Sequence, residues 1–200
     1  LKLLYDCDLI TSAKTQSFQS LIEIVNAVYS FSSSDSDLIY SKFNDLIIWS
    51  SLSKNKYGKN VVENFLKSFY TDEKSKHKHS LLITYILANF LELGQANYST
   101  FVVQAFISSF KDQRVTDLIL SYFNEFCSTR NGVFLIIAAL KSGKDQEVLD
   151  LIISKSESLC RGQYTSTLME FVFKTYTEYA ASRFVDTKRE FILSKSFHII

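Results

Sequence analysis

Pairs of apolar residues recur at helical spacing along this chain. After Gly58 they fall at positions i, i+1, i+4, i+5 and i+8 of one segment: Val61, Val62, Phe65, Leu66 and Phe69. Two later segments repeat the spacing, and an earlier one follows it more loosely: Val102, Val103, Phe106, Ile107 and Phe110; Leu168, Met169, Val172 and Phe173; Leu21, Ile22, Val25, Val28 and Tyr29. Side chains at these spacings share one side of an α-helix, so each segment is predicted to be a helix that buries one stripe.

A second set of apolar stripes lies between these helices. Its members are Leu38, Ile39, Phe43, Leu46, Ile47 and Trp49; Leu81, Leu82, Tyr85, Ile86 and Phe90; Leu118, Ile119, Tyr122, Phe123 and Phe126; and Val148, Leu149, Leu151, Ile152 and Ile153. Ser80 and Thr116 stand where N-caps of two of these helices are expected. Polar stretches that are predicted loops separate the units: 32–37, 71–79, 111–114 and 142–146. The pattern predicts a repeating unit made of an A helix, a short turn and a B helix.

Each B helix opens with a similar seven-residue motif. The five copies are residues 17–23, 57–63, 98–104, 131–137 and 164–170. They recur about every 33 to 41 residues, which is typical of solenoids, where each unit buries its apolar face by stacking on its neighbours. The sequence therefore predicts an all-α solenoid, with residues 1–200 as one segment of about five repeats.

Composition supports helices and argues against several other classes. The chain has no proline and five glycines in 200 residues, too few turn formers for a β-sandwich. Its 22 basic and 21 acidic residues give a net charge of +1, which argues against a nucleic-acid clamp that works by charge alone. The longest uncharged run, residues 93–110, contains many polar residues, so we expect no membrane span.

Candidate catalytic and metal-binding residues are sparse. Cys7, Cys127 and Cys160 are an odd number without paired spacing, so we expect buried, reduced thiols in a cytosolic or nuclear protein. No zinc spacing, Gly-rich phosphate loop or Ser-His-Asp arrangement stands out, and we expect no metal, no cofactor and no enzymatic activity. Because the chain starts at Leu1 rather than Met, we expect it to be part of a longer protein.

Three positions of each motif are expected to project from one surface. If the apolar residues at motif positions five and six face the core, positions three, four and seven share another side of the helix. The resulting triads are Gln19, Ser20 and Glu23; Lys59, Asn60 and Glu63; Thr100, Phe101 and Gln104; Val133, Phe134 and Ile137; and Ser166, Thr167 and Glu170. Four of the five triads are polar or mixed, which a purely structural face does not require.

The motifs Tyr57-Gly58-Lys59-Asn60-Val61-Val62-Glu63 and Tyr98-Ser99-Thr100-Phe101-Val102-Val103-Gln104 resemble the RNA-facing helix motif of the Pumilio (PUF) family. The resemblance implies a right-handed α-α superhelix of the armadillo or PUF type that binds RNA. It implies that the first and last residues of a triad hydrogen-bond a base edge and that the middle one stacks between bases. The RNA-binding residues would be Gln19, Ser20, Glu23, Lys59, Asn60, Glu63, Thr100, Phe101, Gln104, Ser166, Thr167 and Glu170.

Individual triads differ in what this resemblance implies. Thr100 and Gln104 would read a base edge beside a stacking Phe101, and Ser166 with Glu170 resembles a guanine-reading pair. Lys59 departs from the usual small residue, which puts the base preference of its repeat in doubt. The triad of 133, 134 and 137 cannot hydrogen-bond, so we expect no base reading there and a core position for its phenylalanine.

The segments 95–104 and 131–140, with Gln146 and Val148-Leu149 beyond, are similar to the nucleolar Pumilio-type family typified by nucleolar protein nine. That likeness implies binding of precursor ribosomal RNA in small-subunit ribosome biogenesis, in the nucleus and nucleolus, with pre-ribosomal proteins as further partners. Two alternatives stay open. One is a cytoplasmic PUF-type regulator of mRNA, and the other is a HEAT- or armadillo-like scaffold that holds a protein partner.

Overall fold

The computed structural model describes residues 8–31, 41–69, 80–110, 113–143, 146–179 and 181–182, and each regular element that it assigns in these ranges is a helix. The helices are α2 (Leu9–Ala13), α3 (Phe18–Phe31), α5 (Leu46–Ser53), α6 (Gly58–Phe69), α7 (Ser80–Ala88), α8 (Phe90–Gln95), α9 (Ser99–Ser109), α10 (Gln113–Ser121), α11 (Phe123–Cys127), α12 (Arg130–Lys141), α13 (Gln146–Ser154), α14 (Ser156–Leu159) and α15 (Thr165–Thr175). The all-α prediction is confirmed. Cys7, Leu38, Ile39 and the greater part of the predicted loops lie outside the described residues.

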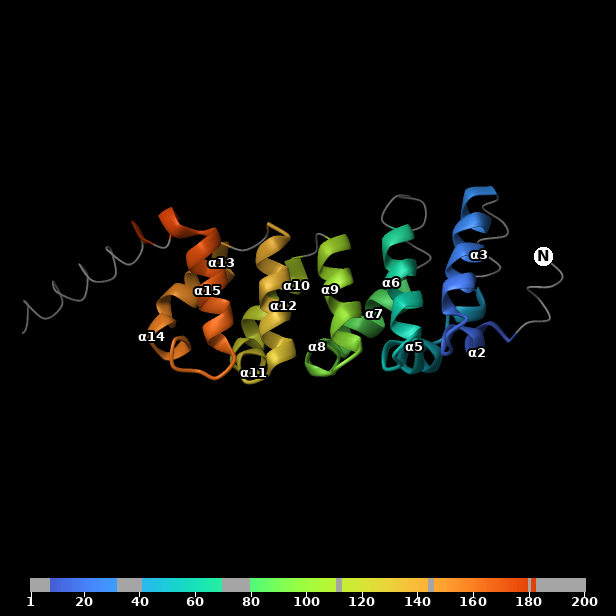
Figure 1. The fold of residues 1–200 in the computed structure, drawn as a ribbon, viewed down its shortest axis with the longest axis horizontal. Coiled ribbons are helices and arrows are strands. Elements are labelled where there is room, and N and C mark those ends of the chain that lie inside the picture. The colour runs from blue at the N-terminus through green and yellow to red at the C-terminus, as the bar shows by residue number, and fades with distance from the viewer. Residues whose placement is uncertain are drawn as a thin grey trace, which may run out of the picture. The chain divides into compact units, whose positions relative to one another are not determined.

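The chain divides into two compact units between Val115 and Thr116. In the first unit α3 packs against α6 and α6 packs against α9, so these three B helices lie side by side (Figure 1). In the second unit α12 packs against α15 (Figure 1). Each B helix is preceded by a short helix that packs on it, in the pairs α2–α3, α5–α6, α8–α9, α11–α12 and α14–α15. The motif copies therefore open the B helices, as predicted.

Three of the A helices differ from the prediction because each of them breaks into two. Asn89, Tyr122 and Lys155 separate α7 from α8, α10 from α11 and α13 from α14, with φ between −115° and −100° and ψ between 7° and 22°. Hydrogen bonds still bridge the first break, from Asn89 N to Tyr85 O at 3.1 Å and from Leu93 N to Asn89 O at 2.9 Å. The Asn89 side chain also donates to Tyr85 O at 2.8 Å, competing with the helical pattern. In these three repeats the unit is therefore three helices rather than two.

The second motif residue is set by a close approach to the preceding short helix. A Cβ on Gly58 would lie 2.7 Å from Leu52 O and 2.9 Å from Leu52 Cα, and Gly132 lies equally tightly against the backbone of Phe126. In α9 the hydroxyl of Ser99 donates to Leu93 O at 3.1 Å, and Thr165 makes the corresponding bond to Leu159 O in α15. In α6, α9, α12 and α15 the side chain at this place is therefore absent, or small and able to donate, whereas the first copy has Phe18 there. The Gly/Ser part of the recurring motif thus has a packing origin.

The core follows the predicted stripes with a few corrections. Motif positions five and six are fully buried in α6, α9, α12 and α15, and Phe43, Trp49 and Phe65 form an aromatic cluster with centroids 5.2–6.1 Å apart. In α6 the side chains of four predicted stripe residues are buried: Val61, Val62, Phe65 and Leu66. The side chain of the fifth, Phe69, lies outside the described part. Leu46, Ile47 and Phe173 were predicted to be buried but are exposed. Six further stripe residues are only half-buried: Ile22, Leu81, Phe110, Leu118, Tyr122 and Leu151.

Two helix beginnings account for further differences from the prediction. Asp45 is the N-cap of α5 and accepts from Ile47 N at 2.7 Å and Ile48 N at 3.1 Å, so the exposed Leu46 and Ile47 lie in the first turn of this helix. Thr116 was expected to cap its helix, but α10 begins at Gln113, so Thr116 is a buried residue within the helix. The helix begins about one turn before the apolar stripe, and the sequence pattern missed this start because the first turn is mostly polar.

The thiol prediction is only partly right. Among the described residues Cys127 and Cys160 are both free, but Cys127 is half-buried and Cys160 is exposed at the C-cap of α14. Burial raises the pKa of the Cys127 thiol to about 11. In the part of the chain that the structure describes, no helix has the length and apolar character to cross a bilayer.

Candidate nucleic-acid interface

The triads are placed by the apolar pair of each motif. Positions five and six are buried in α6, α9, α12 and α15, and in α3 Leu21 is buried and Ile22 half-buried. Positions three, four and seven therefore face another side of each helix. In α3 all three triad residues, Gln19, Ser20 and Glu23, are exposed. Because α3, α6 and α9 pack in series, the first three triads lie on neighbouring helices of one unit.

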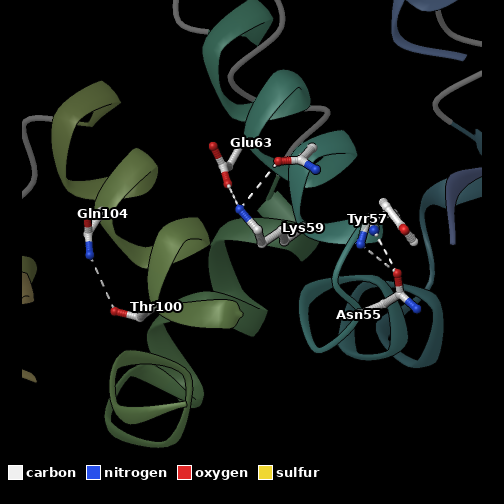
Figure 2. A network of polar contacts seen from close by, with 8 residues as sticks. Asn55, Tyr57, Lys59, Glu63, Thr100 and Gln104 are labelled. Carbon is white, nitrogen blue, oxygen red and sulfur yellow. Dashed lines mark hydrogen bonds and ion pairs between the residues drawn. The ribbon is translucent and has the colours of Figure 1, made fainter. Parts of the chain in front are cut away.

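The α6 triad is closed on itself. The ammonium of Lys59 lies 3.5 Å from Glu63 Oε1 and 3.4 Å from Asn60 Oδ1 (Figure 2). All three residues are half-buried. The start of this helix is fixed by Asn55, whose side-chain oxygen accepts from the amides of Tyr57 and Gly58 at 2.9 Å each (Figure 2).

The α9 triad combines a buried hydroxyl with an exposed ring. Thr100 is 2% exposed and accepts from Gln104 Nε2 at 3.5 Å (Figure 2), whereas Phe101 is 45% exposed. Gln104 is half-buried, so its amide is the more accessible polar group of the pair. The edge-reading role expected of Thr100 stays a prediction, and a ligand that reached its hydroxyl would have to displace the side chains around it.

One contact connects the second and third triads. The Lys59 ammonium lies 4.0 Å from the centroid of the Phe101 ring, which is within the range of a cation–π interaction. The two residues belong to α6 and α9, which pack against each other. Sequence reasoning missed this bridge, because the residues are far apart in the chain and no local pattern connects them.

The α12 triad corrects the expectation for Phe134. Val133 and Ile137 were expected to project from the surface but are buried, whereas Phe134 was expected in the core but is 39% exposed. Position four lies beside the stripe, so the apolar character of its neighbours does not bury it. The guanidinium of Arg130 lies 5.6 Å from the Phe134 ring, one helical turn away. That i, i+4 spacing was visible in the sequence and could have pointed to the pair.

The α15 triad is open. Ser166, Thr167 and Glu170 are all exposed on one face of the helix.

Among the described residues no group of three or more His, Cys, Asp or Glu side chains could hold a metal ion. The triad surfaces thus offer exposed rings, amide and carboxylate groups, and cations beside the rings. Such groups can stack on planar ligands, bind hydrogen-bonding edges and attract anions.

Comparisons with known proteins agree with this architecture. No protein-family model and no curated protein matches the sequence. Among solved structures, the chain is similar to the Puf3 RNA-binding domain bound to recognition site A of the Cox17 RNA 3′ UTR, with a TM-score of 0.67 and 15% identity over 96% of this chain and 58% of that chain. It is also similar to PUF-6 in complex with 5BE13 RNA, with a TM-score of 0.66 and 15% identity over 88% of this chain and 50% of that one.

A third similar structure is PUF-8 in complex with PBE-RNA, with a TM-score of 0.64 and 13% identity over 94% of this chain and 58% of that one. The chain therefore spans 50–58% of the length of these three proteins. At such identities the likeness concerns the fold. The chain has an all-α fold that matches the PUF repeat solenoids.

Proposed function

We propose that this chain binds RNA through the triad faces of its B helices. The observation that carries the proposal is the α9 triad, where an exposed aromatic ring, Phe101, lies beside the amide of Gln104 on a helix that packs directly on the next triad-bearing helix. An unpaired base offers a planar face and a hydrogen-bonding edge, and these two side chains are matched to them. The three similar solved structures are complexes of PUF proteins with RNA, which supports the same ligand class.

Stacking and charge would supply the affinity, rather than a dense set of base-reading contacts. Phe101 and Phe134 are exposed rings that each have a cation within 5.6 Å, Lys59 and Arg130 respectively. Base stacking on an aromatic ring contributes about 1–3 kcal/mol per base and tolerates any base. The same cations can also attract phosphates, although the net charge of +1 keeps the long-range attraction weak.

We further propose precursor ribosomal RNA as the target, in small-subunit ribosome biogenesis in the nucleolus, alongside pre-ribosomal proteins. The support is that two of the five triads are not free to discriminate bases. Lys59 and Glu63 bind each other, and Val133 and Ile137 offer no hydrogen-bonding group. A protein in which at most three triads read bases suits a structured RNA held at many points better than a short mRNA consensus that must be recognised alone. The sequence similarity of segments 95–104 and 131–140 to the nucleolar Pumilio-type family points to the same target.

A selection from a random RNA pool, with the salt dependence of the dissociation constant, tests this function. We expect selected RNAs to share only a short or degenerate sequence, and the logarithm of the binding constant to fall with the logarithm of salt by a slope that corresponds to a few phosphates. A single tight consensus would favour the cytoplasmic mRNA regulator. No binding to any RNA, together with protein partners that survive RNase in a pull-down, would favour the protein scaffold and contradict the proposal.

A further inference from the structure

Lys59 differs in charge from the residues at the same motif position of the other B helices. At the same motif position the other four B helices carry Gln19, Thr100, Val133 and Ser166, and Lys59 is the only charged residue of the set. Its ammonium is shared by three groups on two helices: Glu63 at 3.5 Å, Asn60 at 3.4 Å and the Phe101 ring at 4.0 Å. Figure 2 shows the first two contacts.

The surroundings make this a built contact rather than a loose surface pair. The side chains of Lys59 and Glu63 are 17% and 19% exposed, whereas those of the ion pair Lys54–Glu92 in the same unit are 48% and 62% exposed. A pair that water reaches less is screened less. The contact with Phe101 adds an attraction that a lone surface lysine lacks.

The bridge affects both helices. On α6 it occupies an acceptor oxygen of Glu63, the edge-reading residue of the triad, and the acceptor oxygen of Asn60 beside it. On α9 it places a cation against the Phe101 ring, which is 45% exposed and keeps the rest of its surface for a ligand. A base that approached the α6 triad would have to displace the ammonium before it could reach either acceptor.

We propose that Lys59 is a specificity-determining residue, which closes the α6 triad to base reading and leaves Phe101 to stack without regard to base identity. This inference rests on the proposed RNA binding. The α15 triad shows the open arrangement within the same chain, because Ser166 stands where α6 has Lys59 and both helices carry a glutamate at position seven, Glu170 and Glu63. Replacing Lys59 by serine therefore converts the closed triad into the open pattern. The freed Glu63 carboxylate accepts hydrogen bonds only, so it would favour a base whose exposed edge donates N–H groups.

Two measurements test the closure. The first needs no RNA: in an NMR spectrum of the whole chain, the ring current of Phe101 should shift the ε-methylene protons of Lys59 away from those of the other lysines. The shift should disappear in Phe101→Leu. If Lys59 has an ordinary lysine shift in the wild-type protein, the bridge does not exist in solution and the inference is wrong.

The second measurement is a random-RNA selection with the wild type, Lys59→Ser, Lys59→Arg and the matched charge control Lys54→Ser. Lys59→Ser should gain a preference of about three- to tenfold for an N–H-donating base at one nucleotide, the factor expected when an ion pair and a cation–π contact no longer compete. The wild type, Lys59→Arg and Lys54→Ser should have no preference there. Circular dichroism melts that match the wild type verify that each variant is folded.

The outcomes separate the two proposals. If the wild type binds RNA but Lys59→Ser behaves like Lys54→Ser, with the same loss of affinity and the same change in salt slope, Lys59 is only a phosphate contact and the specificity role is wrong. If the wild type binds no RNA at all, the proposed function fails and this inference fails with it. A gained preference in Lys59→Ser alone, without one in Lys59→Arg, supports the closure.

Discussion

Replacing Phe101 by alanine is the most direct perturbation of the proposed interface. The ring is 45% exposed and borders Gln104 on α9, with Lys59 of α6 against it. Truncation removes the surface on which a base would stack while leaving the buried pair Val102 and Val103 in place. The variant should therefore fold, and its main effect should be on RNA binding.

The magnitude follows from the part of the ring that is available. Stacking on an aromatic side chain contributes about 1–3 kcal/mol per base. Because Lys59 already borders the ring and part of it is buried, we expect a value in the lower half of that range, about 1–2 kcal/mol. The dissociation constant should then rise roughly five- to thirtyfold, with little change in the salt slope, since the phenyl ring carries no charge.

Fluorescence anisotropy with a selected single-stranded RNA measures the change. The matched control is Phe173→Ala, a phenylalanine with 42% exposure on α15 that lies outside the triad positions. We expect the control to bind within about twofold of the wild type, and the melting temperatures of both variants to be close to that of the wild type. Equal dissociation constants for Phe101→Ala and the wild type, or equal losses in the two variants, would remove Phe101 from the interface.

Three further predictions test the fold itself. Gly132→Ala should lower the free energy of unfolding in urea by about 1–3 kcal/mol, because the new Cβ meets the backbone of the preceding helix; an unchanged value would contradict the close approach. Asp45→Ala should cost about 1 kcal/mol in the same assay by removing the N-cap of α5, and Asp45→Ser should recover most of it; equal losses in the two variants would speak against capping. At pH 8 iodoacetamide should modify Cys160 well before Cys127 in a Cys7→Ser background, as followed by peptide mass spectrometry. Burial raises the pKa of the Cys127 thiol to about 11, so this thiol stays protonated and unreactive until the pH approaches that value, and comparable rates at pH 8 would contradict the burial.

Much of the candidate interface was predictable because it depends on local periodicity. Once Val61 and Val62 are assigned to the core, the geometry of an α-helix fixes that Lys59 and Glu63 lie on another side. The recurrence of the motif likewise predicted that the B helices pack in series, and they do so in α3, α6 and α9. The RNA-binding roles of the triad residues themselves stay predictions.

Residues beside the apolar stripe were the ones that sequence reasoning misjudged. Phe134 was assigned to the core from its apolar neighbours, yet it is exposed, and Thr100 was expected at the surface, yet it is buried. At the boundary of a stripe, burial depends on the size and position of side chains on the neighbouring helix. The sequence of one helix does not contain that information.

By itself the sequence determined the helical class, the repeat, the start of each B helix and the buried pair of each motif, because these follow from contacts within one or two turns of chain. Only the tertiary structure showed the breaks in three A helices, the reason for a Gly, Ser or Thr at the second motif position in four of the five copies, and the bridge from Lys59 to Phe101. The last two arise where separate helices meet, and distances between separate helices are set by the packing of many side chains at once.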